Sequence, residues 1–174
     1  MNVGQILLWL CLLSSVFASI SGVLGLKRTD WARVGRFSSV AVFSLSSSAL
    51  VILALAFLGD DFSFRYVALH SCYDLPWVYK LTAVWAGQEG SLLLWFWLLT
   101  LFSAILISAH RRGDEIVDNS LPVLALIQLF FSSLLAFLCR PFERSPLPRE
   151  EGQGLNPLLQ NPYMILHPPT LHMG

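Results

Sequence analysis

The chain has 174 residues, of which 55% are hydrophobic, and its eleven basic residues balance its eleven acidic ones. Charges gathered into short clusters between long apolar runs are typical of a multi-spanning membrane protein. A net charge of zero gives no overall field that would attract nucleic acid. The three cysteines form no CxxC or CxxCH motif, which excludes a c-type cytochrome or a thiol-redox module.

Four apolar runs each have about the 20 residues that a helix needs to cross a bilayer. They cover residues 4–26, 38–58, 91–109 and 121–139. The first run has no preceding basic residue and no clear small-x-small cleavage site, so we predict a retained span and not a signal peptide. The fold class is therefore an all-α integral membrane protein. Its membrane domain, residues 1–139, has four transmembrane helices, and an outer segment, 140–174, follows.

The basic residues predict which connections face the cytoplasm. Six of the eleven lie in the two connections that join the first run to the second and the third to the fourth: Lys27, Arg28, Arg33, Arg36, Arg111 and Arg112. By the positive-inside rule both connections are cytoplasmic. The N-terminus and the segments 59–90 and 140–174 then lie on the outer side.

Polar residues inside the predicted spans are few. Gln128 lies in the middle of the fourth run and needs a partner, either on another helix or on another subunit. The second run carries Ser44, Ser46, Ser47 and Ser48, which let helices approach closely and can bond to their own backbone. A transporter or channel would need ionisable residues along a path, and these spans offer only an amide and hydroxyls.

The outer segment 59–90 begins with aromatic residues that alternate with polar ones, Phe62, Phe64 and Tyr66. This alternation predicts a short extended piece with one aromatic face. A short interfacial helix should follow from Pro76, because Trp77, Leu81, Val84 and Trp85 recur at helical spacing. We expect Lys80 to point away from that apolar face.

A polar, glycine-rich stretch then runs directly into the third apolar run: Trp85-Ala86-Gly87-Gln88-Glu89-Gly90-Ser91-Leu92-Leu93-Leu94-Trp95. Glu89 would open the third helix, where the positive end of the helix dipole favours a carboxylate. That structural role explains Glu89 by itself. A catalytic acid would need a partner. The nearest candidates are Asp74 and Lys80, and their spacing from Glu89 does not indicate a catalytic pair.

Histidines on the predicted outer side are the candidate ligands. His167 precedes two prolines, whose fixed φ would hold the imidazole stiffly towards a metal or a haem. The plainer interpretation of the residue alone is an interfacial polar side chain. His70, His167 and His172 lack the spacing of a zinc site, and His110, on the opposite side, is expected at a polar helix end. Whether the outer cysteines Cys72 and Cys139 pair is left open.

Two blocks of this sequence resemble those of a known family. Residues 84–95 closely resemble the WGxxEGSLLLW signature of CcmF/NrfE-type cytochrome c maturation proteins, which handle haem. Three further stretches look like the family's NPF…GxxLNPLLQ…HPP region: Pro141–Arg144, Gly152–Gln160 and His167–Pro169. The resemblance covers essentially the whole chain in order.

The resemblance implies cytochrome c-type biogenesis: a haem lyase that holds b-type haem and attaches it to the CxxCH segment of apocytochrome c outside the membrane. It implies that His167 is an axial haem ligand. His172 stands where the family usually has tyrosine and is a candidate additional ligand. The first block would be the motif that docks partners, through Trp85, Gly87, Gln88, Glu89, Gly90, Ser91 and Trp95.

The chain also departs from the family. Members are several times longer, and the tryptophan-rich WWD loop, the second external histidine and the membrane-embedded haem histidines are not found here. We therefore expect an N-terminal portion that needs a C-terminal complement and is inactive alone. Expected partners are that complement, a haem chaperone, apocytochrome c delivery proteins and membrane lipid. The expected location is a bacterial inner membrane, or an organelle inner membrane. The alternative is a non-catalytic scaffold that docks other maturation proteins.

Overall fold

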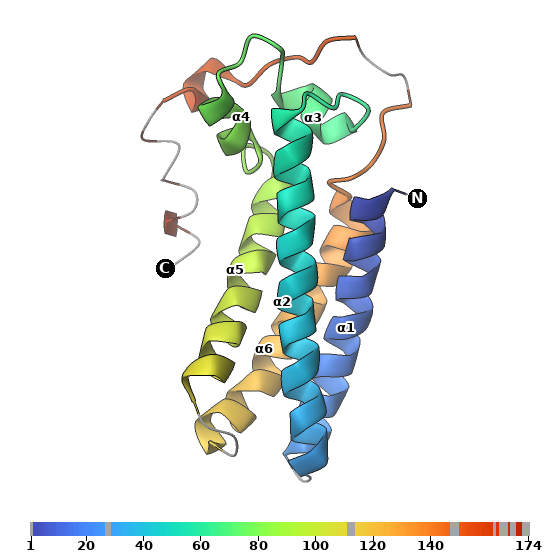
Figure 1. Ribbon diagram of the computed structural model, residues 1–174, viewed down its shortest axis with the longest axis vertical. Coiled ribbons are helices and arrows are strands. Elements are labelled where there is room, and N and C mark those ends of the chain that lie inside the picture. The colour runs from blue at the N-terminus through green and yellow to red at the C-terminus, as the bar shows by residue number, and fades with distance from the viewer. Residues whose placement is uncertain are drawn as a thin grey trace.

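The computed structural model describes residues 2–26, 29–110, 114–146 and 150–161, together with 163, 167 and 170–171. Within these residues the chain forms a bundle of four long helices (Figure 1). They are α1 (Val3–Gly25), α2 (Thr29–Leu58), α5 (Gln88–Ala109) and α6 (Glu115–Leu134), the last continued by a π-helical turn over Leu135–Cys139. All four are long and apolar enough to cross a membrane, which confirms the predicted fold class.

The helices extend beyond the apolar runs because polar residues continue or cap them. α2 begins at Thr29 instead of residue 38, so Arg33 and Arg36 lie on the helix and not in a loop. Asp114 precedes α6, and its Oδ1 accepts the Ile116 N–H at 3.0 Å. Capping of this kind satisfies helix-terminal N–H groups that have no intrahelical partner.

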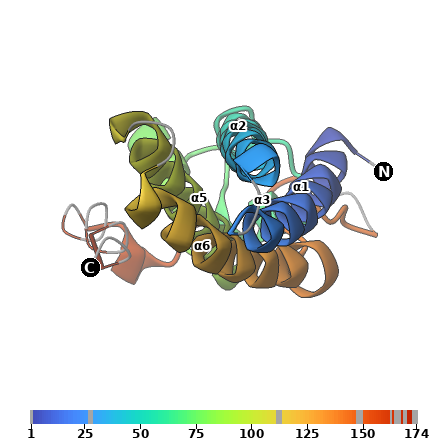
Figure 2. The same ribbon diagram turned by 90° about the horizontal axis from the view of Figure 1, so that it is seen from below.

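The bundle packs α1 against α2 and α6, and α2 against α5 (Figure 2). Glycines at the crossings let the helix backbones lie close together. A Cβ on Gly22 of α1 would lie 3.2 Å from the Pro122 backbone of α6, and one on Gly35 of α2 would lie 3.3 Å from the Gly22 nitrogen. Small residues at helix crossings are the usual device of membrane bundles, because lipid gives helices no hydrophobic reason to associate.

Some polar residues within the spans have partners on neighbouring helices, whereas Ser15 Oγ and Gln128 Oε1 are buried without one among the described residues. Gln128 Nε2 donates to Ser103 Oγ at 2.7 Å and to the Leu99 carbonyl at 3.3 Å, both on α5. The Ser46 and Thr100 hydroxyls lie 2.9 Å apart between α2 and α5. The predicted interhelical partner of Gln128 is therefore confirmed.

The serines of α2 bond to their own backbone as predicted. Ser44 Oγ donates to the Val40 carbonyl, and Ser48 Oγ donates to the Ser44 carbonyl. Ser47 instead accepts the indole N–H of Trp97 at 2.9 Å. These hydroxyls satisfy one another or the backbone, which agrees with a packing role.

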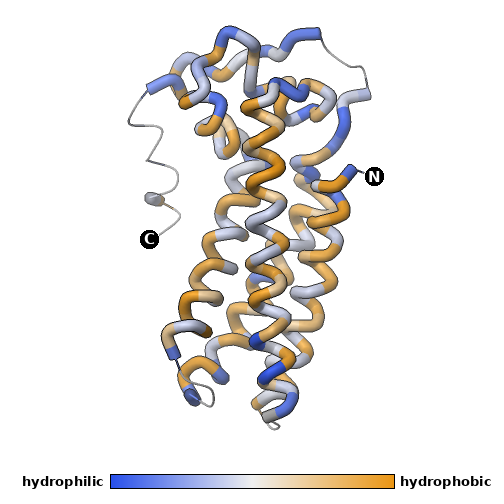
Figure 3. Tube along the Cα trace, viewed as in Figure 1, coloured by the Kyte–Doolittle hydropathy of each residue, from blue (hydrophilic) through white to orange (hydrophobic). Residues whose placement is uncertain are grey.

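The two ends of the bundle differ. One end, the loop end, carries the α1–α2 and α5–α6 connections. The other carries α3 (Arg65–His70), α4 (Trp77–Ala83) and the 3-10 turn η2 (Pro157–Leu159) (Figure 1). Hydrophobic residues fill the helices between them, and hydrophilic residues gather at both ends (Figure 3). The basic residues Arg33 and Arg36 lie at the loop end, opposite α3 and α4.

Cysteine labelling tests the predicted orientation. With Cys11, Cys72 and Cys139 replaced by alanine, we expect a Glu150→Cys variant to react with a membrane-impermeant maleimide added outside intact cells. An Asp30→Cys variant, on the loop end, should react only after permeabilisation. Both positions are exposed. Labelling of the Asp30 variant in intact cells would contradict the orientation.

Candidate functional site

Opposite the loop end, two segments far apart in sequence form one structure, which we call the cap: residues 59–90 and the described part of 140–161. Backbone hydrogen bonds join them along α3. The Arg65 N–H donates to the Glu143 carbonyl at 2.9 Å, and the Ser145 N–H donates to the Ser63 carbonyl at 2.8 Å. Gln153 N–H donates to the Ala68 carbonyl at 2.8 Å. Helix α3 thus positions the second sequence block.

The predicted extended aromatic piece is wrong. Tyr66 lies in α3, and only Phe64 has strand-like pairing, in an isolated antiparallel bridge to Arg144. Phe62, Phe64 and Tyr66 are all buried. The chain turns through residues 62–63 and starts a helix, and all three rings join the hydrophobic core. Alternation alone therefore could not distinguish a strand from a turn followed by a helix.

The Tyr66 hydroxyl holds the motif loop before α5. It accepts the Gly87 N–H at 3.0 Å and lies 3.1 Å from the Val84 carbonyl and 3.3 Å from the Ala83 carbonyl, to either of which it can donate. Burial raises the pKa of Tyr66 above its ordinary value, so the hydroxyl keeps its donor proton at neutral pH. One buried hydroxyl therefore satisfies one N–H and one carbonyl of a non-helical loop.

The glycines of the motif are explained by close contacts. A Cβ on Gly90 would overlap the Val84 carbonyl oxygen and lie 2.5 Å from Tyr66 Oη, and one on Gly87 would lie 2.8 Å from His70 Nε2. Any side chain at these positions would push the loop away from α3. The glycines are thus needed for the loop to reach the Tyr66 hydroxyl.

A buried ion pair fixes α4 to the turn that follows α2. Lys80 Nζ donates to Asp60 Oδ2 at 2.5 Å, with side-chain exposures of 9% and 14%. The predicted helix is present as α4. Lys80, expected to point away from the apolar face of this helix, is buried, whereas Trp77 of that face is 66% exposed. Asp60, which lies outside α4, determines which side of this helix faces the protein. The sequence of α4 alone does not indicate that side.

The motif residues come together around the start of α5. The Ser91 hydroxyl donates to the Trp85 carbonyl at 2.8 Å, and the Trp85 indole N–H is buried without a partner among the described residues. Glu89 lies in the first turn of α5, as expected. Gln88 is exposed. Further along α5, the Trp95 ring lies 4.9 Å from that of Phe131 on α6.

The candidate haem ligand is on the surface of the protein. His167 is exposed, and its carbonyl accepts the Thr170 hydroxyl at 2.9 Å. The candidate ligand His172 and the prolines after His167 fall outside the described residues. His70 borders the motif loop, since a Cβ on Gly87 would lie 2.8 Å from its Nε2, and its Nδ1 lies 3.0 Å from the Tyr66 carbonyl.

No group of three or more metal-ligating side chains occurs within the described part of the chain. Cys72 and Cys139 are both free. The residue that sequence reasoning missed is Tyr66. Tyr66 is the last of the alternating aromatic residues, and this pattern singles it out in the sequence. Its hydrogen-bond partners, however, lie about twenty residues further along the chain.

Comparison with known proteins now bears on this geometry. The family model described as cytochrome C assembly protein matches residues 85–174, more than half of the chain. This chain belongs to that family. The match begins at Trp85, the first residue of the motif loop, and includes the second block and His167.

Similar proteins agree with this membership. The chain is 41% identical over 154 residues to a probable cytochrome c-type biogenesis protein NrfE of Escherichia coli, covering 84% of this chain and 27% of that protein. It is 37% identical to the cytochrome c-type biogenesis protein CcmF of Pseudomonas aeruginosa, covering 99% and 27%. A solved structure of the cytochrome c heme lyase CcmF matches 98% of this chain and 27% of that one, at TM-score 0.79 and 27% identity.

The chain thus spans about a quarter of the length of the relatives it matches. The matched structure covers nearly all of the present chain, so the four helices and the cap form a recognisable unit of the longer family architecture.

Replacing Gly90 by alanine tests the contact between the loop and Tyr66. We expect Gly90→Ala to destabilise the folded protein by about 1–3 kcal/mol, because the added methyl group has no space. Gln88→Ala, at an exposed position two residues away, should change stability by less than about 0.5 kcal/mol. Thermal unfolding in detergent measures both, and equal melting of the two variants would contradict the contact.

A double-mutant series tests the buried ion pair. Lys80→Met leaves Asp60 buried without its partner and should cost about 3–5 kcal/mol. Adding Asp60→Asn removes the stranded charge and should restore much of that stability. Arg65→Gln, which breaks the exposed pair with Glu143, is the control and should cost about 1 kcal/mol or less. A double variant no more stable than Lys80→Met would refute the assignment.

Proposed function

We propose that the chain acts in cytochrome c-type biogenesis, as the part of a haem lyase that offers His167 to the iron of its haem substrate. The observation that carries this proposal is the family match, which includes both the motif loop and His167. The lyase would attach the haem to the CxxCH segment of an apocytochrome c.

The chemistry of His167 suits this role. A neutral imidazole is a common axial ligand of haem iron. His167 is exposed, so no described part of the fold covers its ring. The two prolines that follow it in sequence restrict the backbone there, which favours a fixed ligand direction. The second axial ligand would come from the remainder of the family's length, supplied by a C-terminal complement.

The cap would serve as the rigid platform beside this ligand. Its two segments are joined by backbone hydrogen bonds, and the Lys80–Asp60 pair fixes α4 to the turn that follows α2. Gln88 is exposed at the edge of the motif loop. That edge is where we expect the haem chaperone or an apocytochrome c delivery protein to dock. In a bacterial inner membrane the cap would face the periplasm, as the positive-inside rule predicts.

Substitution of His167 tests the ligand role. The full chain, co-purified with its C-terminal complement, should show a haem absorption spectrum that His167→Ala shifts or abolishes, with a matching loss of cytochrome c yield. His110→Ala is the control, because His110 lies at the loop end and should leave both readouts unchanged. An unchanged spectrum and yield for His167→Ala would refute the proposed ligand.

The same preparation separates the haem lyase from the scaffold alternative. A chain that only docks partners would lose co-purification on combined substitution of Gln88 and Glu89 by alanine, and it would bind haem equally well with and without His167. A haem-ligating chain gives the opposite pattern for His167. His167→Ala therefore changes the haem spectrum if the chain ligates haem and leaves it unchanged if the chain is a scaffold.

A further inference from the structure

A cleft of about 420 Å³ opens at the loop end between α2 and α5. It is lined by Arg33, Arg36, Phe37, Val40, Ile107 and His110. The cleft is at the opposite end of the bundle from the cap, so neither the motif loop nor His167 contributes to it. Its residues have no part in the function proposed above.

The walls of the cleft are apolar and uncovered. Phe37 is 76% exposed and Val40 is 40% exposed, and Ile107 faces them from α5 across the cleft. All three lie on helices long and apolar enough to span a membrane. A groove of this kind, running along two such helices, fits a hydrocarbon chain.

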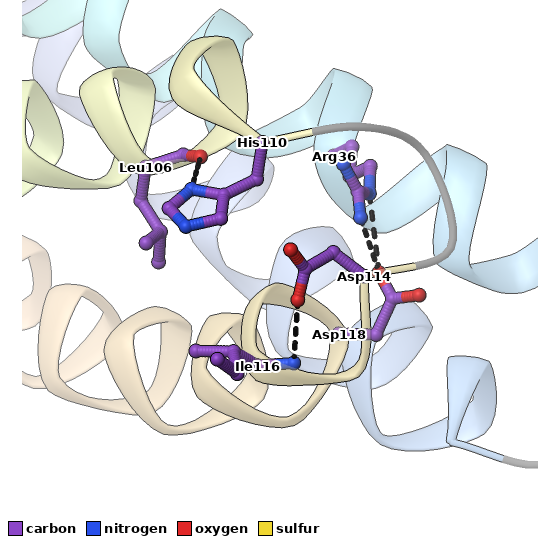
Figure 4. A network of polar contacts seen from close by, with 6 residues as sticks. All are labelled: Arg36, Leu106, His110, Asp114, Ile116 and Asp118. Atoms are coloured by element: carbon purple, nitrogen blue, oxygen red, sulfur yellow. Dashed lines mark hydrogen bonds and ion pairs between the residues drawn. The ribbon is translucent and has the colours of Figure 1, made fainter.

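The rim of the cleft is cationic. Arg36 donates through Nε and Nη2 to a single oxygen of Asp118, at 3.1 and 2.7 Å, and its Nη1 makes no hydrogen bond to any residue that the structure describes. Arg33 is exposed and makes no ion pair with any residue that the structure describes. His110 Nδ1 lies 3.1 Å from the Leu106 carbonyl, so the ring folds back on α5 (Figure 4).

Two acidic groups at this end are engaged. Asp118 pairs with Arg36, and Asp114 caps α6 by accepting the Ile116 N–H (Figure 4). Over residues 27–36 and 110–118 the sequence holds six arginines and lysines against four carboxylates. The end as a whole is therefore net positive. Among the residues that the structure describes there, Arg33 is a cation without a carboxylate partner.

We propose that this cleft binds an anionic phospholipid, with its phosphate at Arg33 and the free edge of Arg36 and one acyl chain along Phe37, Val40 and Ile107. Charge complementarity selects an anionic headgroup, and the apolar walls select a lipid over a free anion. Basic pockets between transmembrane helices on the cytoplasmic side suit such headgroups. The predicted orientation places the loop end in that leaflet.

Native mass spectrometry of the full chain tests the site, with phosphatidylglycerol and phosphatidylcholine as the two probes. The chain should retain phosphatidylglycerol preferentially. Arg33→Gln should reduce that retention about fivefold, since one basic residue near an anionic surface contributes about 1 kcal/mol. Arg65→Gln, which removes an exposed cation from the cap, is the matched control and should leave retention unchanged.

A second variant separates the acyl groove from the charge. Phe37→Ala removes an exposed ring, so it should weaken phosphatidylglycerol retention without lowering thermal stability in lipid-free detergent. Equal retention of both lipids, or equal losses for Arg33→Gln and Arg65→Gln, would overturn the proposal. Displacement of phosphatidylglycerol by millimolar inorganic phosphate would also overturn it, because the site would then recognise an anion alone.

Discussion

The cap depends on the Tyr66 hydroxyl and the loop that closes over it. The chain between α4 and α5 is not helical, and Ala83 and Val84 at its start are buried, so their backbone groups have little access to water. Tyr66 accepts the Gly87 N–H and lies within bonding distance of two carbonyls. Because Gly87 and Gly90 carry no side chain, the loop can approach this closely. Satisfaction of backbone groups thus explains why the motif combines glycines with a short polar run.

Two buried or half-buried ion pairs tie the helices together at opposite ends. Lys80–Asp60 joins α4 to the turn that follows α2, within the cap, and Arg36–Asp118 joins α2 to α6 at the loop end. Burial of such charges is costly unless both partners are present. Each pair therefore holds together two segments that are separate in sequence.

The two ends also divide the proposed roles. At the cap, α3 holds the second family block by backbone pairing and the motif loop by the Tyr66 hydroxyl, while His167 is exposed. At the loop end, an apolar groove with a cationic rim faces the opposite leaflet. A rigid platform beside an accessible imidazole suits the handling of a large flat substrate, and a lipid at the far end would stabilise the helices that support it.

The sequence by itself determined the four spans, the need of Gln128 for an interhelical partner and the family, because the length and apolar character of a span and a run of motif residues are local properties. The tertiary structure alone decided that Lys80 faces inward and that Tyr66, not an extended strand, organises the motif loop. Those outcomes depend on Asp60 and Gly87, each about twenty residues away in the chain. Pairing between distant polar groups is set by how the helices pack, and no local pattern encodes it.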